Sequence, residues 1–249
     1  MRGNSDMRYK SIISYAEIIK REEIMLQRGM NFRIKPGYSI ILMSVREGAP
    51  YRDRWHEDTG LLEYEGHDEP KRPGIDPKKL DQPLRTTTGT LTENGKFFEA
   101  ASTFKEKKHK SEVVQVYEKI SEGVWCDRGR YELIDATIVS DGIRKVCRFF
   151  LRPAKTPRAN EPLLRQTRII PTAIKVEVWK RDQGHCVICG SKNNLHFDHD
   201  VPYSKGGSSI TAKNVRLLCA RHNLSKSDKI MTFAPWLTTL ASAFFSRAG

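Results

Sequence analysis

Four side chains with soft ligand atoms form two short pairs in the last third of the sequence. Cys186 and Cys189 are separated by two residues, and Cys219 and His222 have the same spacing. Each pair can place two ligands on one side of an ion, and two pairs complete the tetrahedral coordination that Zn²⁺ prefers in proteins. Because no position is left for water, the spacing predicts a structural zinc site rather than a catalytic one. The alternative, two incidental pairs in a hydrophobic core, leaves the repeated spacing unexplained.

Residues suited to hydrolytic chemistry lie between these pairs and directly after them. Residues 195–207 read Leu-His-Phe-Asp-His-Asp-Val-Pro-Tyr-Ser-Lys-Gly-Gly, and residues 211–226 read Thr-Ala-Lys-Asn-Val-Arg-Leu-Leu-Cys-Ala-Arg-His-Asn-Leu-Ser-Lys. In this order they resemble the HNH, or ββα-metal, endonuclease family, and the resemblance extends over residues 173–229. It implies a zinc-stabilised nuclease domain with a hairpin and with a helix that begins at the Asn-Val-x-x-Leu-Cys motif, residues 214–219.

The resemblance also implies the roles of four residues. Asp198 and Asn223 would bind a catalytic divalent cation, Mg²⁺ or Mn²⁺. His199 would be the general base, and Asn214 would fix the loop that carries it. In the family the fourth zinc ligand is most often Cys, whereas this chain has His222. A second assignment, with His222 on the catalytic ion and Asn223 in a structural role, leaves zinc with three ligands.

The proposed chemistry explains why these residue types are needed. Phosphodiester hydrolysis requires a water that is deprotonated near neutral pH and a cation that neutralises charge on the phosphate. The pKa of histidine suits the first task. Asp198 and His199 are neighbours, so they point to opposite faces of a strand unless the following hairpin bends it. His185 and His196 match no role in the motif, and we expect them to be packed or solvated.

Aromatic and acidic residues are mixed with turn residues between positions 49 and 68. Such a mixture suits a pocket for a planar base, and it equally suits a half-buried hairpin. Further along the chain stand Lys-Lys-Leu-Asp-Gln-Pro-Leu, Val-Val-Gln-Val-Tyr, Gly-Arg-Tyr-Glu-Leu-Ile-Asp-Ala and Val-Cys-Arg-Phe-Phe-Leu-Arg-Pro. In this order the segments resemble the SRA domain, a PUA-like β-barrel that recognises modified cytosine, over residues 40–153.

The SRA resemblance implies a pocket for a flipped base. Tyr64 and Tyr51 would stack on the base, and Asp53 would bind the cytosine amino group. Glu65 would be the fourth residue of this pocket. It replaces the small polar residue that usually follows the stacking tyrosine, so the preferred modification is open. The alternatives for this region are another PUA-like reader of modified bases and a domain that reads unmodified sequence.

These patterns together predict an α+β protein with four segments. Apolar residues at helical spacing over positions 9–28 predict an amphipathic helix within residues 7–30. Short β-rich runs separated by turn residues predict a mostly antiparallel barrel over 31–153. A basic linker over 154–171 leads to the nuclease domain and C-terminal tail, 172–249.

Composition indicates a polyanionic partner. Lys and Arg number 43 against 30 Asp and Glu, a formal net charge of +13. Eleven Lys and Arg against two acids lie in residues 144–181, where we expect contacts with DNA phosphates. No apolar run approaches the about 20 residues of a membrane-spanning helix, and the start lacks the apolar stretch of a signal peptide. We therefore expect a cytoplasmic protein without disulfides and without a membrane partner.

The function predicted from the sequence is that of a modification-dependent DNA endonuclease. Its expected partner is double-stranded DNA that contains 5-methylcytosine or 5-hydroxymethylcytosine. One HNH module cuts one strand, so a double-strand break would require a homodimer. Two alternatives are an HNH endonuclease that reads unmodified sequence and a non-catalytic, zinc-stabilised reader of modified DNA.

Overall fold

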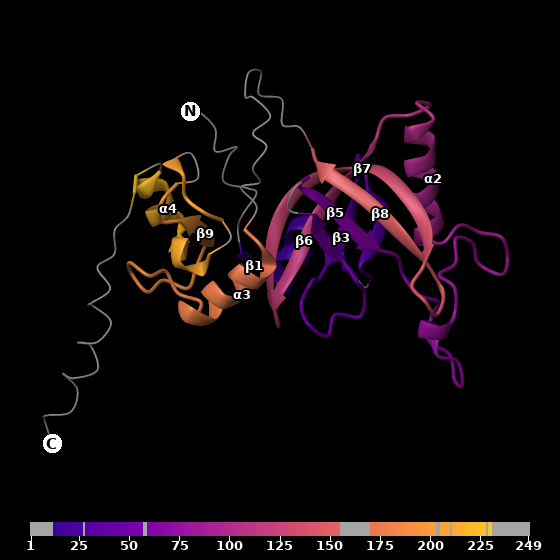
Figure 1. Cartoon of the computed structure of the whole chain (residues 1–249), viewed down its shortest axis with the longest axis horizontal. Helices are drawn as coiled ribbons and strands as arrows, with labels where there is room; N and C mark the ends of the chain where they lie inside the picture. Colours follow the sequence, from indigo (N-terminus) through magenta and orange to yellow (C-terminus); the bar gives the residue numbers. More distant parts are fainter. Residues whose placement is uncertain are drawn as a thin grey trace, which may run out of the picture.

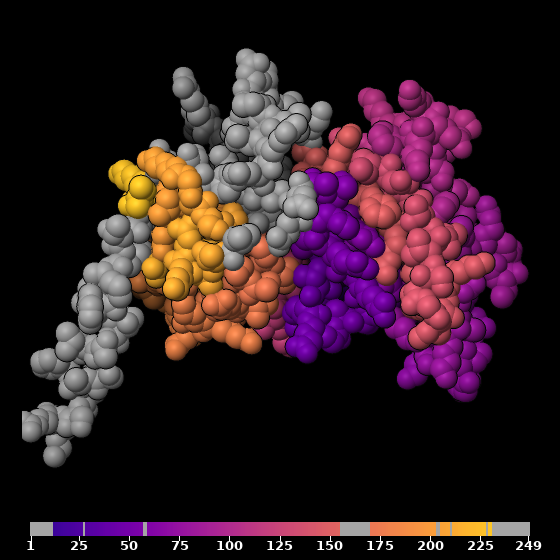
Figure 2. Space-filling model, in the orientation of Figure 1, coloured from indigo at the N-terminus to yellow at the C-terminus, as the bar shows by residue number. Residues whose placement is uncertain are grey.

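The computed structural model contains a β-rich unit followed by a smaller unit, and it confirms the predicted α+β class (Figure 1). Figure 2 shows the two in contact, with the orange surface of the smaller unit against the indigo surface of the larger one. None of the helices among the residues described by the structure is both long and apolar enough to span a bilayer. The residues that the structure describes are 12–26, 28–56, 59–154, 170–202, 205–209, 211–227 and 229–230.

The β-rich unit is built on one eight-stranded sheet with the order β2-β3-β6-β7-β8-β5-β4, in which β1 also pairs with β7. Strands β3 and β6 are parallel, and the other paired strands are antiparallel, as the sequence predicts. The long strands are strongly curved (Figure 1). The strands are β1 Ile12–Ser14, β2 Met30–Lys35, β3 Tyr38–Met43, β4 Arg54–His56, β5 Leu61–Glu65, β6 Glu112–Ser121, β7 Val124–Ser140 and β8 Lys145–Pro153.

One face of this sheet holds the main hydrophobic core. Helix α2 (Glu93–Lys105) begins at Thr92, whose side chain accepts a hydrogen bond from the Gly95 N–H. It buries Phe97 against Phe149 of β8, with the ring centroids 5.9 Å apart. A single 3-10 turn, η1 (Pro77–Lys79), lies in the connection between β5 and α2. The packed aromatic pair fixes α2 relative to the sheet.

The predicted amino-terminal helix is wrong in extent. Helix α1 spans only Tyr15–Glu22, and the residues before it form β1. Ser14 and Glu17 make a capping box, which starts the helix at this point. Ile12 and Ile13 precede the cap and pair with β7 instead. The part of the prediction before residue 12 lies outside the described residues.

The smaller unit has the hairpin and the helix that the resemblance implies, but the helix begins later in the sequence than expected. Helix α3 (Thr172–Arg181) is followed by β9 (Leu195–His199), the 3-10 turn η3 (Ala212–Asn214), β10 (Val215–Cys219) and α4 (Ala220–Lys226). The helix predicted over 214–219 is wrong, because these residues form β10 and pair antiparallel with β9. The helix begins only at Ala220. The predicted basic linker, apart from its ends, and the C-terminal tail lie outside the described residues.

Candidate functional site

The two Cys/His pairs meet at one point, as their spacing predicts. Cys186 and Cys189 lie in the connection between α3 and β9, Cys219 ends β10, and His222 is on the first turn of α4. Their ligand atoms all lie within 4.8 Å of one another. Cys189 Sγ is 3.8 Å from Cys219 Sγ, and His222 Nδ1 is 3.3 Å from Cys186 Sγ. A tetrahedron with metal–sulfur bonds of about 2.3 Å and metal–nitrogen bonds of about 2.0 Å has edges of about 3.5–3.8 Å, so the four residues fit a metal ion.

The backbone around Cys186 favours its ligand form. Burial raises the pKa of this thiol, but hydrogen bonds from the backbone of Cys219, Cys189 and Ile188 outweigh it and lower the pKa to about 6. The thiolate is the form that binds metal. The fold therefore prepares this ligand before an ion arrives.

The loop after β9 is fixed by Asn214. Its Oδ1 accepts a hydrogen bond from the Val201 N–H at 2.8 Å, and its Nδ2 donates to the carbonyl oxygens of Val201 and Ser208 at 3.1 and 3.0 Å. Gly207 packs closely against the Val201 carbonyl, and a Cβ at position 207 would lie 1.8 Å from the Val201 oxygen. The Asn214 side chain thus bonds the backbone at both ends of the loop, at Val201 and at Ser208.

His199 stands at the start of this loop, at the end of β9. Its side chain is buried, and Nε2 lies 2.9 Å from Ser209 Oγ, which fixes the orientation of the imidazole. Pairing with β10 is regular through Asp198 and His199. The two neighbours consequently reach different partners, as expected for adjacent residues of an unbent strand.

Asp198 turns to helix α4. Its Oδ2 is buried and lies 2.7 Å from the ammonium of Lys226, whose side chain is also buried. Asn223 precedes Lys226 by three residues on α4, so both lie on one face of that helix. The ammonium of Lys226 already pairs with the Asp198 carboxylate, so a divalent cation would have to displace it. A carboxylate and an amide are oxygen ligands of the kind that a divalent cation prefers.

Three of the four residues predicted to bind a base line one cavity of about 390 Å³ in the β-rich unit, namely Tyr51, Asp53 and Tyr64. Tyr64 has only 1% of its surface exposed and belongs to the core. Tyr51 is half-buried. Of the two tyrosines, Tyr51 is therefore the more exposed.

Asp53 and Glu65 differ in their surroundings, although both are buried. Asp53 accepts hydrogen bonds from the backbone N–H groups of Ser44 and Glu65 at 3.0 and 3.1 Å. Burial outweighs these bonds and raises the pKa of Asp53 to about 7. Glu65 is not among the residues around the cavity and instead lies 3.3 Å from the guanidinium of Arg148. The predicted place of Glu65 in the pocket is thus wrong.

His67 is a cavity residue that sequence reasoning missed. Its ring stacks on Tyr51 with centroids 5.3 Å apart, and its Nε2 lies 3.1 Å from the Tyr64 hydroxyl. Burial lowers the pKa of His67 to about 4, so the imidazole is neutral at pH 7. The Asn94 side chain holds its backbone by two bonds of 2.8 Å. In the sequence, the Gly66-His67 pair shortly after Tyr64 is the one feature that could have indicated this residue.

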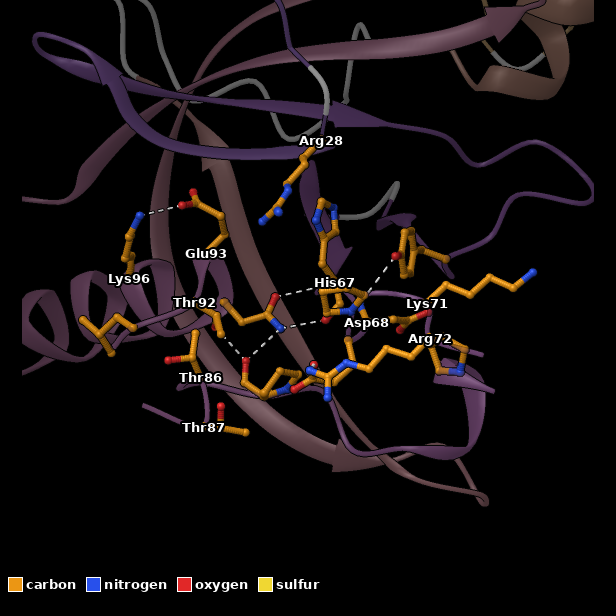
Figure 3. Close-up of a pocket in the computed structure, with 17 residues that line it drawn as sticks. Arg28, His67, Asp68, Lys71, Arg72, Thr86, Thr87, Thr92, Glu93 and Lys96 are labelled. Atoms are coloured by element: carbon orange, nitrogen blue, oxygen red, sulfur yellow. Dashed lines mark hydrogen bonds and ion pairs between the residues drawn. The ribbon is translucent and has the colours of Figure 1, made fainter. Parts of the chain in front are cut away.

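A second cavity of about 690 Å³ adjoins the first and shares Arg28, Tyr51 and His67 with it. Figure 3 shows Arg28 pointing into this space beside His67. The acids around it are already paired, for example Asp68 with Arg144 at 2.6 Å and Glu93 with Lys96 at 2.6 Å. The two cavities meet at the Tyr51–His67 stack.

The expectation that the basic region 144–181 contacts phosphates is wrong for its buried members. Arg144 pairs with Asp68, Arg148 with Glu65, and Lys175 with Glu118, and all three cations are buried. Because acidic residues of the protein already pair with these three cations, they do not face DNA phosphates. Residues 155–169 of this region lie outside the described part of the chain.

Comparison with known proteins identifies the smaller unit. Residues 186–229 match the HNH endonuclease family, which confirms that resemblance for the segment with the Cys/His cluster, Asp198, His199, Asn214 and Asn223. No curated protein matches the chain.

Solved structures with similarity include two of the SUVH5 SRA domain, one with fully methylated and one with fully hydroxymethylated CG DNA. Each is 18% identical, with a TM-score of 0.41, and covers 64% of this chain and 96% of that chain. The DNA modification-dependent restriction endonuclease AspBHI is 14% identical, with a TM-score of 0.40, over 60% of this chain and 76% of that chain.

Proposed function

We propose that the protein is a modification-dependent DNA endonuclease that binds a flipped 5-methylcytosine or 5-hydroxymethylcytosine in the β-rich unit. The HNH unit then hydrolyses a phosphodiester bond. The observation that carries this proposal is that Tyr51, Asp53 and Tyr64 line one cavity in a chain that also contains an HNH segment. Double-stranded DNA is therefore the proposed partner.

The chemistry of the cavity suits a cytosine. A base can stack on the Tyr51 ring where it displaces His67, which stacks on that ring, or Lys78, whose Nζ lies 4.2 Å from the ring centroid. Such stacking contributes about 1–3 kcal/mol per base. A carboxyl group with a pKa of about 7 is partly protonated at neutral pH. In its neutral form Asp53 can donate to the cytosine N3 atom and accept from the N4 amino group. These contacts offset the few kcal/mol of lost stacking and pairing that base flipping costs.

The HNH unit supplies the residues for hydrolysis. We assign His199 as the general base, which takes a proton from the attacking water onto its imidazole while the P–O bond to the leaving oxygen breaks. Ser209 orients the imidazole, and Asn214 holds the loop around it. Asp198 and Asn223 would hold Mg²⁺ or Mn²⁺, which supplies charge neutralisation at the phosphate. The Cys/His cluster would hold a structural Zn²⁺.

Matched duplexes test the proposal. Binding and cutting are measured at fixed salt with DNA that carries cytosine, 5-methylcytosine or 5-hydroxymethylcytosine at one position. The parent should prefer a modified duplex, and Tyr51→Ala should reduce that preference about ten- to hundredfold. Tyr64→Ala is a poorer probe, because Tyr64 is part of the core. Equal binding and cutting of all duplexes by the parent would leave an HNH endonuclease that reads unmodified sequence.

A further inference from the structure

A buried ion cluster holds the HNH unit against the β-rich unit. Its centre is Glu118 of β6, which has no exposed surface. The hydroxyl of Thr172 donates to Glu118 Oε1, and Nζ of Lys175 lies 2.5 Å from Oε2. Arg128 of β7 lies 3.4 Å from the same oxygen. Since Thr172 and Lys175 belong to α3, one carboxylate is shared by both units.

Such a cluster fixes an orientation as well as a contact. Burial raises the pKa of Glu118, but the charges of Lys175 and Arg128 outweigh this and keep the carboxyl ionised. Charge-assisted hydrogen bonds are short and directional. A purely apolar contact tolerates sliding, whereas three partners around one buried carboxylate are satisfied in only one arrangement.

Strand β1 provides a second, independent tie. Its side chains alternate between the two units, as the period of a strand requires. Ile12 packs against the hydrophobic core of the HNH unit, whereas Ile13 is buried with Ile18 and Tyr117 of the β-rich unit. The backbone of β1 pairs with β7 at the same time.

Helix α3 connects the ion cluster to the catalytic loop by direct contacts. At its C-terminal end, Arg181 donates to the carbonyl oxygens of Ala212 and Val215 at 2.6 and 2.7 Å. Ala212 begins η3 and Val215 follows it, so Arg181 holds both ends of the turn that contains Asn214, which fixes the loop after His199. A helix of ten residues is about 15 Å long, so a rotation of its first turn moves the catalytic loop.

We propose that Glu118 and Lys175 are positioning residues that hold the HNH centre at one fixed distance from the base cavity. The enzyme then cuts at a single offset from the modified base. This inference rests on the proposed function. A nuclease held only by the chain between the two units would reach several phosphates and would cut over a range of positions.

The test maps cut positions on a long, end-labelled duplex with one modified cytosine. The variants are Glu118→Gln and Lys175→Met. The matched control is Glu112→Gln, because Glu112 is also buried on β6 but bonds only Ser39 and Arg33 of the β-rich unit. The parent and the control should each cut at one dominant position per strand. Both test variants should cut over several neighbouring phosphates while their binding of the modified duplex is retained.

Calorimetry of the free proteins gives a readout that needs no cutting. The parent and Glu112→Gln should unfold in one transition, whereas the test variants should show two, because the units are no longer locked together. Lys175→Met leaves the Arg128–Glu118 pair in place, so it answers the question even where Glu118→Gln fails to fold.

Three results would overturn the inference: broad cutting by the parent, unchanged cut positions in both variants, or one unchanged transition in both. A parent without preference for modified DNA would instead contradict the proposed function. In that case the calorimetric test of the docked arrangement would still stand.

Discussion

Replacement of Asn214 by alanine tests whether the loop around His199 must be held in place. The substitution removes three hydrogen bonds, one accepted from the Val201 N–H and two donated to the carbonyl oxygens of Val201 and Ser208. None of them involves a side chain that we assign to the chemistry. We therefore expect the substitution to disorder the loop around His199 without removing a group that takes part in the chemistry.

The size of the loss follows from these contacts. A hydrogen bond contributes about 0.5–1 kcal/mol net when water can replace the lost partner, and Asn214 is only partly buried, so three bonds are worth about 2 kcal/mol. Since about 1.4 kcal/mol corresponds to a factor of ten, the equilibrium constant between the ordered and the disordered loop falls about 30-fold. If cutting needs the ordered loop, its rate should fall by up to that factor.

The assay compares single-turnover cutting of a bound, modified duplex by the parent and by Asn214→Ala. Asn193→Ala is the matched control, because Asn193 lies in the same unit with an exposed side chain. Affinity for the duplex should be unchanged in both variants. Gly207→Ala should reproduce the defect by a different route, since its Cβ would collide with the Val201 carbonyl.

Cutting by Asn214→Ala at the parent rate would refute this reasoning, because the loop would then be ordered without the three bonds. Loss of binding together with cutting would also contradict it. Such a result would mean that the loop contributes to DNA affinity, which no contact of Asn214 supports.

Three further changes test other parts of the site. His199→Ala should bind DNA normally and lower cutting about 10²–10⁴-fold, and near-normal nicking would contradict its role as general base. Cys186→Ala should lose bound zinc and lower the unfolding enthalpy of the protein, because the HNH unit no longer folds, whereas a folded, active, zinc-free variant would exclude a structural metal. Because burial raises the pKa of Asp53 from 3.8 to about 7, the folded protein holds this proton more tightly than the unfolded chain. Its contribution to the free energy of unfolding should fall between about pH 4 and pH 7 and then level off. Urea titrations across this pH range give the free energy of unfolding as a function of pH. This free energy should fall more steeply with pH in the parent than in Asp53→Asn, and parallel pH profiles would disprove the shift.

Features that depend on short spacing could be predicted from the sequence. The two Cys/His pairs carry their geometry within four residues each, and the Asn214 motif places its amide beside the loop that it holds. The state of residues 214–219 could not be predicted in this way. The segment has too few polar positions to distinguish a helix from a strand, and pairing with β9 decides the outcome.

Contacts between distant segments were beyond the reach of the sequence. Asn94 clamps His67 across 27 positions, and Lys175 meets Glu118 across 57. In the sequence Lys175 is one more positive charge in a basic region, which favours a phosphate contact. Only the fold shows that a buried carboxylate already uses this charge.

Glu65 illustrates how a residue outside the cavity can still shape it. Its Oε2 accepts a hydrogen bond from the Arg52 N–H at 3.0 Å, and Arg148 donates to the Arg52 carbonyl at 2.8 Å. The Glu65–Arg148 ion pair therefore holds the backbone N–H and carbonyl groups of Arg52, the residue between Tyr51 and Asp53. The backbone N–H of Glu65 also donates to Asp53 Oδ1. A small polar side chain at position 65 could not reach Arg148 and Arg52 together, so the larger acid contributes by holding the Tyr51–Asp53 wall in place rather than by contacting the base.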